Sequence, residues 1–217
     1  MNTQDEGVIS FNVQHNHTQL STRKYYTLSQ ELSAWRSLFW KLKLIGQDHQ
    51  RYQGAGFGNV SARIMPFSTA RGHRPFMITG TQTGQQEELT LDAYSVVTTY
   101  ELYAHTLSSY GQLLPSSESM THAALYDLNT CVRYIFHAHA PCIWHQAKAL
   151  KLPTTAANIA YGSIDMAYAV QRLYQQGKFN LGQVLVMEGH QDGVMSCGAT
   201  AEEAGQALIQ AWVRARQ

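Results

Sequence analysis

The sequence of 217 residues has a formal net charge of +1 and 14% charged residues, and its length predicts one domain with a sizeable core. No run of Lys and Arg exceeds two residues and no apolar segment is long enough to cross a bilayer, so we expect neither nucleic-acid binding nor a membrane protein. The polar N-terminus lacks the apolar core of a signal peptide, and the three cysteines lack close spacing, which together predict a cytoplasmic protein with reduced thiols.

The chain begins with a polar region that precedes the first predicted helix. Residues 1–26 are mostly polar with short β-like fragments, and we expect an extended N-terminal arm before a domain over residues 27–217. Apolar residues at helical spacing predict a helix over residues 27–40, with Thr27 or Ser29 as its N-cap.

Short strands and glycine-rich turns follow this helix. The glycine-rich segment 54–59 leads into a predicted strand over residues 60–64. Residues 76–79 form another apolar run that ends in the polar turn 80–84, and β-branched and aromatic residues predict extended structure over residues 95–103.

The second half of the chain alternates helices with strands. Helices are predicted from residue 115 past residue 122 and over residues 141–150, 164–175 and 200–216, and strands over residues 132–139, 183–188 and 194–196. Thr200 is the predicted N-cap of the last helix, with Glu203 at the capping-box position. Since no repeat or internal linker interrupts this pattern, we predict a single α/β domain.

Two histidines near the end of a predicted strand are the first candidates for chemistry. Strand side chains alternate between faces, so His137 and His139 should project from the same side and could supply two corners of a metal site. The alternative is two unrelated histidines at a strand end. His190 lies just beyond the predicted strand 183–188 and could add a third ligand, and three histidines with an open position are typical of a catalytic metal site.

Glu118 and His122 are four residues apart on a predicted helix and therefore share a face. Near a metal, Glu118 could be a ligand, a general base, or each at different steps. The alternative is a capping glutamate followed by a partly buried histidine.

Three segments rich in glycine and hydroxyl side chains could donate hydrogen bonds to an anion. They are Gly58 with Asn59, residues 79–84, and Ser116 with Ser117. The last pair would do so at the N-terminus of a helix. Each segment alone would be an ordinary loop, but their joint presence beside the histidines favours a binding site.

Together and in this order, these motifs resemble the class II aldolase/adducin family. The resemblance spans residues 27–216 and is carried by residues 58–61, 78–84, 114–118 with His122, 137–139, 189–190, 193–194 and 201–204. It implies a three-layer α/β/α fold around a mostly antiparallel sheet. It also implies a homotetramer with active sites between subunits.

The resemblance further implies a role for individual residues. A divalent metal, often zinc, would be held by His137, His139 and His190, with Glu118 as base and, in aldolases, also as a metal ligand. Three imidazoles and one carboxylate suit zinc but also iron, cobalt, nickel or manganese. The substrate phosphate would be bound at the positions of Gly58, Asn59, Thr83, Gly84, Ser116 and Ser117. The implied reaction is the cleavage or rearrangement of a small hydroxy-carbonyl compound, a sugar phosphate among the candidates, through a metal-stabilised enediolate.

The chain departs from the family pattern at three places. The turn from His190 to Gly193 has two additional residues, so Asp192 could add a carboxylate at the rim of the site. In the threonine-glycine loop (residues 79–84), which is longer than is usual in the family, either Thr81 or Thr83 could contact phosphate. No tyrosine stands where fuculose-phosphate aldolase places its proton donor, and Tyr161 is the nearest substitute.

The sequence therefore leaves several functions open. A metal-dependent lyase leads, and an epimerase or a dehydratase of the same family is the alternative, with His122, His145 or Tyr161 as the acid of a dehydratase. A non-catalytic scaffold like the adducin head domain is the alternative from a different class, because a fold does not determine a function.

Overall fold

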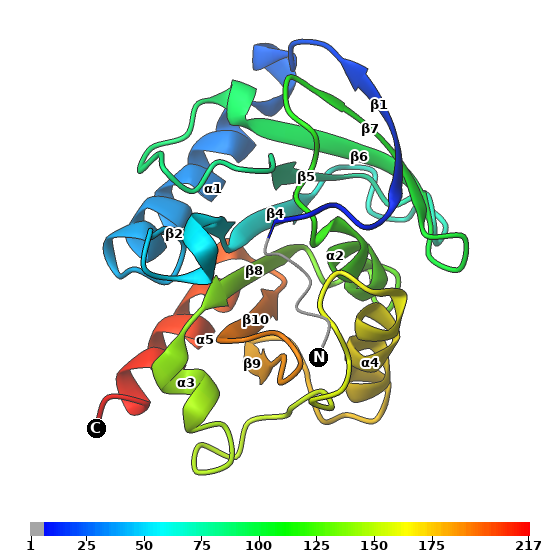
Figure 1. The fold of residues 1–217 in the computed structure, drawn as a ribbon. Helices are drawn as coiled ribbons and strands as arrows, with labels where there is room; N and C mark the ends of the chain where they lie inside the picture. The colour runs from blue at the N-terminus through cyan, green and yellow to red at the C-terminus, as the bar shows by residue number, and fades with distance from the viewer. Residues whose placement is uncertain (1–6) are drawn as a thin grey trace.

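In the computed structural model, which describes residues 7–217, eight strands form one sheet in the order β1-β7-β6-β5-β4-β8-β10-β9 (Figure 1). These strands are β1 Asn12–His17, β4 Asn59–Arg63, β5 Phe76–Thr79, β6 Tyr94–Glu101, β7 Thr106–Gly111, β8 Tyr134–His139, β9 Gln183–Val186 and β10 Gly193–Gly198. Neighbouring strands are antiparallel, except that β1 runs parallel to β7. A separate ribbon pairs β2 (Gly46–Gln47) with β3 (Gly56–Phe57).

Helices cover both faces of the sheet (Figure 1). On one face lie α1 (Thr22–Lys41), α3 (Pro141–His145) and α5 (Ala201–Arg214), which share a buried apolar cluster with Val60, Phe136 and Val194. On the other face, α2 (Ser119–Tyr126) and α4 (Ile164–Gln175) pack against a second cluster that contains Ile78, Ile135 and Met195. The predicted α/β fold with a mostly antiparallel central sheet is confirmed, and its helices form the two outer layers.

Several elements were predicted to the residue. The strand over residues 76–79 and the helix over residues 164–175 have the predicted bounds. The helix α4 is capped by Ser163, whose hydroxyl accepts the Met166 N–H at 3.2 Å. Thr200 caps α5 as predicted, accepting the Glu203 N–H at 3.1 Å.

The start of the chain differs from the prediction. The first helix begins at Thr22 rather than Thr27, with Ser21 as its N-cap, because the buried Tyr25 anchors an additional turn to the core. Part of the predicted arm, β1, is an edge strand of the sheet. Residues 1–6 of that arm lie outside the described residues.

Two predicted helices are shorter than expected. The helix that opens near Pro115 begins at Ser119, because residues 114–116 pair instead with residues 79–81 through Ser116 N–H to Thr79 O (3.2 Å) and Thr81 N–H to Leu114 O (2.9 Å). The helix from Pro141 ends at His145, after which the chain turns back toward β9. The strand β7 was not predicted.

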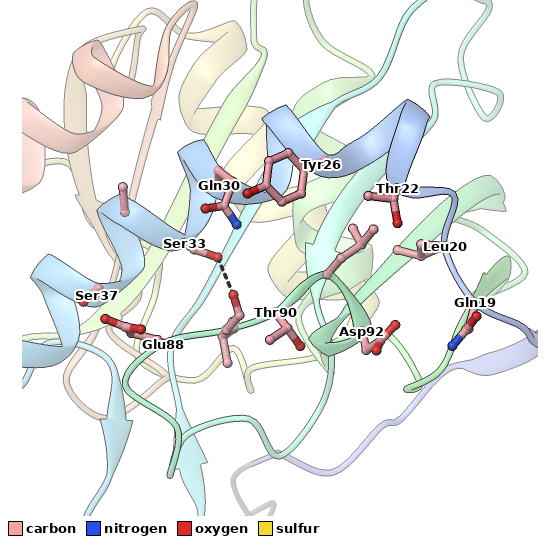
Figure 2. A pocket seen from close by; sticks show the side chains of 13 residues that line it. Gln19, Leu20, Thr22, Tyr26, Gln30, Ser33, Ser37, Glu88, Thr90 and Asp92 are labelled. Carbon is pink, nitrogen blue, oxygen red and sulfur yellow. Dashed lines mark hydrogen bonds between the residues drawn. The ribbon is translucent and has the colours of Figure 1, made fainter.

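The helix α1 is fastened to the segment that follows the threonine-glycine loop. A polar groove separates α1 from residues 88–92, and at its floor Ser33 donates to the Leu89 carbonyl at 3.0 Å (Figure 2). Trp40 at the end of the helix donates to the Gly84 carbonyl at 3.1 Å. Through these contacts α1 holds a loop that belongs to the candidate site.

The three cysteines are not joined in disulfides in this structure. Among the helices of the described residues, none combines the length and the apolar character that crossing a membrane requires.

Candidate metal centre

Three histidines meet at the ends of two neighbouring strands. Phe136 and Ala138 of β8 pack in the cluster under α1 and α5, so strand alternation places His137 and His139 on the opposite face. Since β10 pairs with β8, the turn before β10 carries His190 to the same place. One ring nitrogen from each histidine lies within 4.8 Å of the others, and all three side chains are buried. The three predicted ligands are thus brought together.

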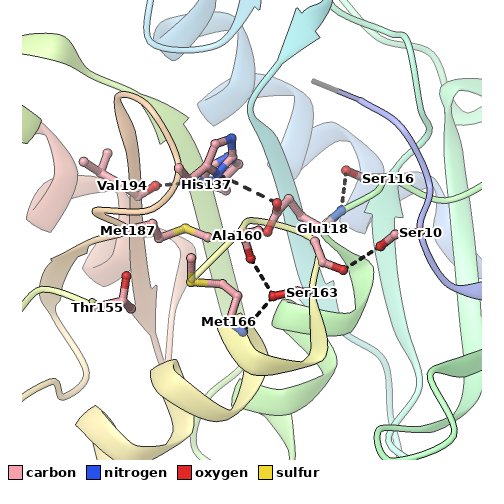
Figure 3. A network of polar contacts seen from close by, with 12 residues as sticks. Ser10, Ser116, Glu118, His137, Thr155, Ala160, Ser163, Met166, Met187 and Val194 are labelled. Atoms are coloured by element: carbon pink, nitrogen blue, oxygen red, sulfur yellow. Dashed lines mark hydrogen bonds and ion pairs between the residues drawn. The ribbon is translucent and has the colours of Figure 1, made fainter. Parts of the chain in front are cut away.

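The orientation of His137 fits a metal ligand. Its Nδ1–H donates to the Val194 carbonyl at 3.0 Å, which leaves the lone pair on Nε2 (Figure 3). Within residues 7–217, this buried Nε2 has no hydrogen-bond partner. A buried acceptor without a partner is costly unless a ligand satisfies it, and a divalent metal would do so.

The electrostatic environment keeps these imidazoles neutral. Burial, followed by the neighbouring His190, lowers the pKa of His137 well below its ordinary value. The same two causes lower the pKa of His139. Neutral imidazole is the form that binds metal, so the donor set fits a divalent ion.

These pKa shifts predict that the metal-free protein loses stability in mild acid. Below about pH 6.5 the unfolded chain protonates its histidines while the folded chain does not, so the free energy of unfolding should fall by about 1.4 kcal/mol per pH unit for each such histidine. Urea unfolding of the metal-free protein at about pH 7 and about pH 5 measures this loss. Equal stability at the two pH values would contradict the predicted neutral state.

Glu118 lies beside the histidines as the N-cap of α2. Its carboxyl Oε1 is 3.8 Å from His190 Nδ1, and both side chains are buried. Its backbone N–H donates to the Ser116 hydroxyl at 3.4 Å (Figure 3). The carboxylate is therefore close enough to the three nitrogens to exchange a proton with a molecule bound there, or to approach a metal.

His122 is also buried, but its ring is not one of the three whose nitrogens converge. Its Nδ1 and the Tyr126 hydroxyl both hydrogen-bond to the Ser61 hydroxyl at 2.6 Å. Burial lowers the pKa of His122 to about 3, so this ring is neutral at physiological pH and is a poor proton donor. His145, another predicted candidate acid, is exposed on α3.

The predicted anion-binding residues line one small pocket. Its wall contains Gly58, Asn59, Thr83, Gly84, Ser116 and Ser117, together with Gly7, Gly56 and residues 80–82. Both Thr81 and Thr83 therefore reach it. Asn59 pairs directly with His137 across β4 and β8, so the pocket adjoins the three histidines. The Asn59 Oδ1 is buried without a hydrogen-bond partner among the described residues.

Tyr161 contacts one of the histidines directly, whereas Asp192 is linked to them through Tyr52. The Tyr161 ring stacks on His190 with centroids 4.4 Å apart. Asp192, expected at the rim, accepts the Tyr52 hydroxyl at 2.6 Å instead of joining the nitrogen group.

The sequence reasoning missed Arg51 and Tyr52. The Tyr52 ring packs against His139 at 4.6 Å, and Arg51 donates to the Tyr52 hydroxyl at 2.6 Å. No motif marks these residues, because a loop outside the main sheet brings them to the site.

A model of the class II aldolase and adducin N-terminal domain matches residues 45–216. L-fuculose-1-phosphate aldolase from Thermus thermophilus has a similar structure, with a TM-score of 0.62, 17% identity and coverage of 88% of this chain and 92% of that chain. A sugar-phosphate aldolase from Thermotoga maritima is also similar, with a TM-score of 0.64 and 13% identity, and the match covers 88% of this chain and 93% of that chain. At these identities the likeness shows a shared fold. The sequence matched none of the curated proteins with which it was compared.

Proposed function

Because the chain belongs to the class II aldolase and adducin family, we propose that it is a metal-dependent lyase that cleaves or rearranges a small hydroxy-carbonyl compound. One observation carries the proposal: three buried imidazole nitrogens lie within 4.8 Å of one another, beside a buried carboxylate. Three histidines with room for a further ligand are typical of catalytic rather than structural metal sites.

The metal that His137, His139 and His190 would hold is zinc in our proposal, with Glu118 as a further ligand in part of the cycle. When bound, a divalent ion supplies Lewis-acid polarisation of a substrate carbonyl or hydroxyl oxygen. The imidazoles are neutral and buried, which suits zinc, and their burial keeps bulk water away from the nitrogens.

The protein's own residues then divide the remaining work. Glu118 takes up the proton that leaves the substrate, and its isolation from solvent strengthens its interaction with the reacting atoms. Tyr161, stacked on His190, supplies a proton to the departing fragment. The pocket from Gly58 to Ser117 binds a phosphate group and anchors the substrate next to the histidines.

We also propose that the protein is a homotetramer. Tyr26 and Leu38 on α1 and Val213 on α5 are large apolar side chains that remain more than two-fifths exposed in one chain. Association of subunits would cover such side chains.

Metal-dependent turnover tests the proposal. The zinc-loaded protein should release two fragments from a member of a panel of sugar phosphates and hydroxy-ketones, and a chelator should abolish the reaction. Product analysis separates the alternatives, since an epimerase inverts one centre and a dehydratase releases water. A protein that turns over no compound and takes up no metal would instead match the adducin-like scaffold.

A further inference from the structure

Arg36 of α1 is a fully buried cation behind the anion pocket. Its side chain is 1% exposed, and its guanidinium donates to three backbone carbonyls. The bonds run to Thr83 O at 2.8 Å, Gln86 O at 2.5 Å and Glu87 O at 2.9 Å. All three carbonyls belong to the loop that carries Thr83 and Gly84.

No carboxylate of residues 7–217 neutralises this guanidinium. Glu87 contacts Arg36 only through its backbone, while its carboxylate pairs with Lys41 at 3.3 Å. Burying a charge without an opposite charge costs free energy, and backbone dipoles offset only part of that cost. Holding the loop would need hydrogen bonds but not a net charge.

The loop places the charge next to the pocket. The Thr83 carbonyl accepts from Arg36, and in a trans peptide the following N–H, that of Gly84, points the opposite way. A Cβ built on Gly56 would lie 3.3 Å from the Gly84 nitrogen, so the two backbone segments pack closely, and both glycines line the pocket. The guanidinium is thus separated from the pocket by a single peptide unit.

We propose that Arg36 is an electrostatic positioning residue for the anion pocket. It aims the Gly84 N–H toward a bound anion, and its uncompensated charge raises the affinity for a phosphate group through the pocket wall. The proposal rests on the proposed function, which assigns the pocket to substrate phosphate. Arg36 lies outside the matched residues 45–216, so the family likeness does not assign it this role.

Binding of inorganic phosphate to the full-length protein tests this role without turnover. In calorimetric titrations, Arg36→Gln should weaken phosphate binding by about tenfold or more, because it removes the charge but keeps a donor. Trp40→Phe is the matched control, because it removes an uncharged donor to the same loop, and its dissociation constant should stay within about threefold of the wild type. Equal losses in the two variants would show that loop placement alone matters, and no loss in Arg36→Gln would also overturn the proposal.

Arg36→Lys provides a second measurement if Arg36→Gln does not fold. A buried ammonium loses its proton more readily than a guanidinium. The ratio of the phosphate affinity of Arg36→Lys to that of the wild type should therefore fall by about tenfold between about pH 7 and about pH 9.5. A constant ratio over this range would contradict the electrostatic role.

The two proposals can fail separately. Turnover of substrates by a wild-type protein that does not bind phosphate would overturn the role of Arg36 and leave the lyase in place. Phosphate binding that depends on the charge of Arg36, without any turnover of substrate, would support the proposed role of Arg36 and count against the proposed lyase activity.

Discussion

Glu118→Gln is expected to lower kcat by about a thousandfold while the protein keeps its metal, because a positioned base contributes on the order of a hundred- to ten-thousandfold. Glutamine has the shape of glutamate but cannot take up the proton. The three histidines converge without Glu118, so they should retain the ion. Steady-state kinetics and metal content of the same preparation measure both effects.

Glu188→Gln is the matched control for this variant. Glu188 is an exposed carboxylate in the turn that precedes His190, and its replacement should change kcat by less than about twofold. If Glu118→Gln retains full activity, Glu118 is not the base. If instead it loses the metal, the carboxylate acts mainly as a ligand.

Gly84→Ala is expected to destabilise the fold by about 3 kcal/mol and to weaken phosphate binding. A Cβ at this position would overlap the Gly46 carbonyl oxygen and approach Gly56 Cα to 2.8 Å. Both obstacles are backbone atoms, so the loops around the pocket would have to separate. Urea unfolding and phosphate titration measure the two effects.

Gly177→Ala separates this steric effect from a general cost of replacing glycine. A Cβ at Gly177 meets no atom within 4 Å, although its φ of +67° is unfavourable for alanine. We expect a loss of only about 1 kcal/mol and unchanged phosphate binding. If the Gly84→Ala protein is as stable as the Gly177→Ala protein, the backbone segments at Gly46, Gly56 and Gly84 are not tightly packed.

The strands and helices that were predicted best are those in which the pattern of apolar residues in the sequence matches the residues that are buried in the structure. The strand over residues 76–79 is an apolar run buried on both faces, and the helix over residues 164–175 has an apolar stripe and a serine cap. By contrast, β1 has a polar, largely exposed sequence, and its pairing with β7 is long-range. A polar edge strand carries no hydrophobic period from which to predict it.

The candidate site was foreseen in part for the same reason. Alternation along one strand sufficed to place His137 and His139 together, and the order of motifs pointed to His190 and the anion pocket. Arg36, Arg51 and Tyr52 were missed because their contacts join segments that only the tertiary structure brings together. The roles of Glu118, Tyr161 and the pocket residues stay predictions.

The most direct test is the metal content per chain of tag-free protein, measured for the wild type and for His137→Ala. We predict about one divalent ion per wild-type chain and its loss in the variant, since two imidazoles alone hold an ion weakly. Absence of metal from both proteins, with none taken up on titration with zinc, would contradict a metal centre at these histidines.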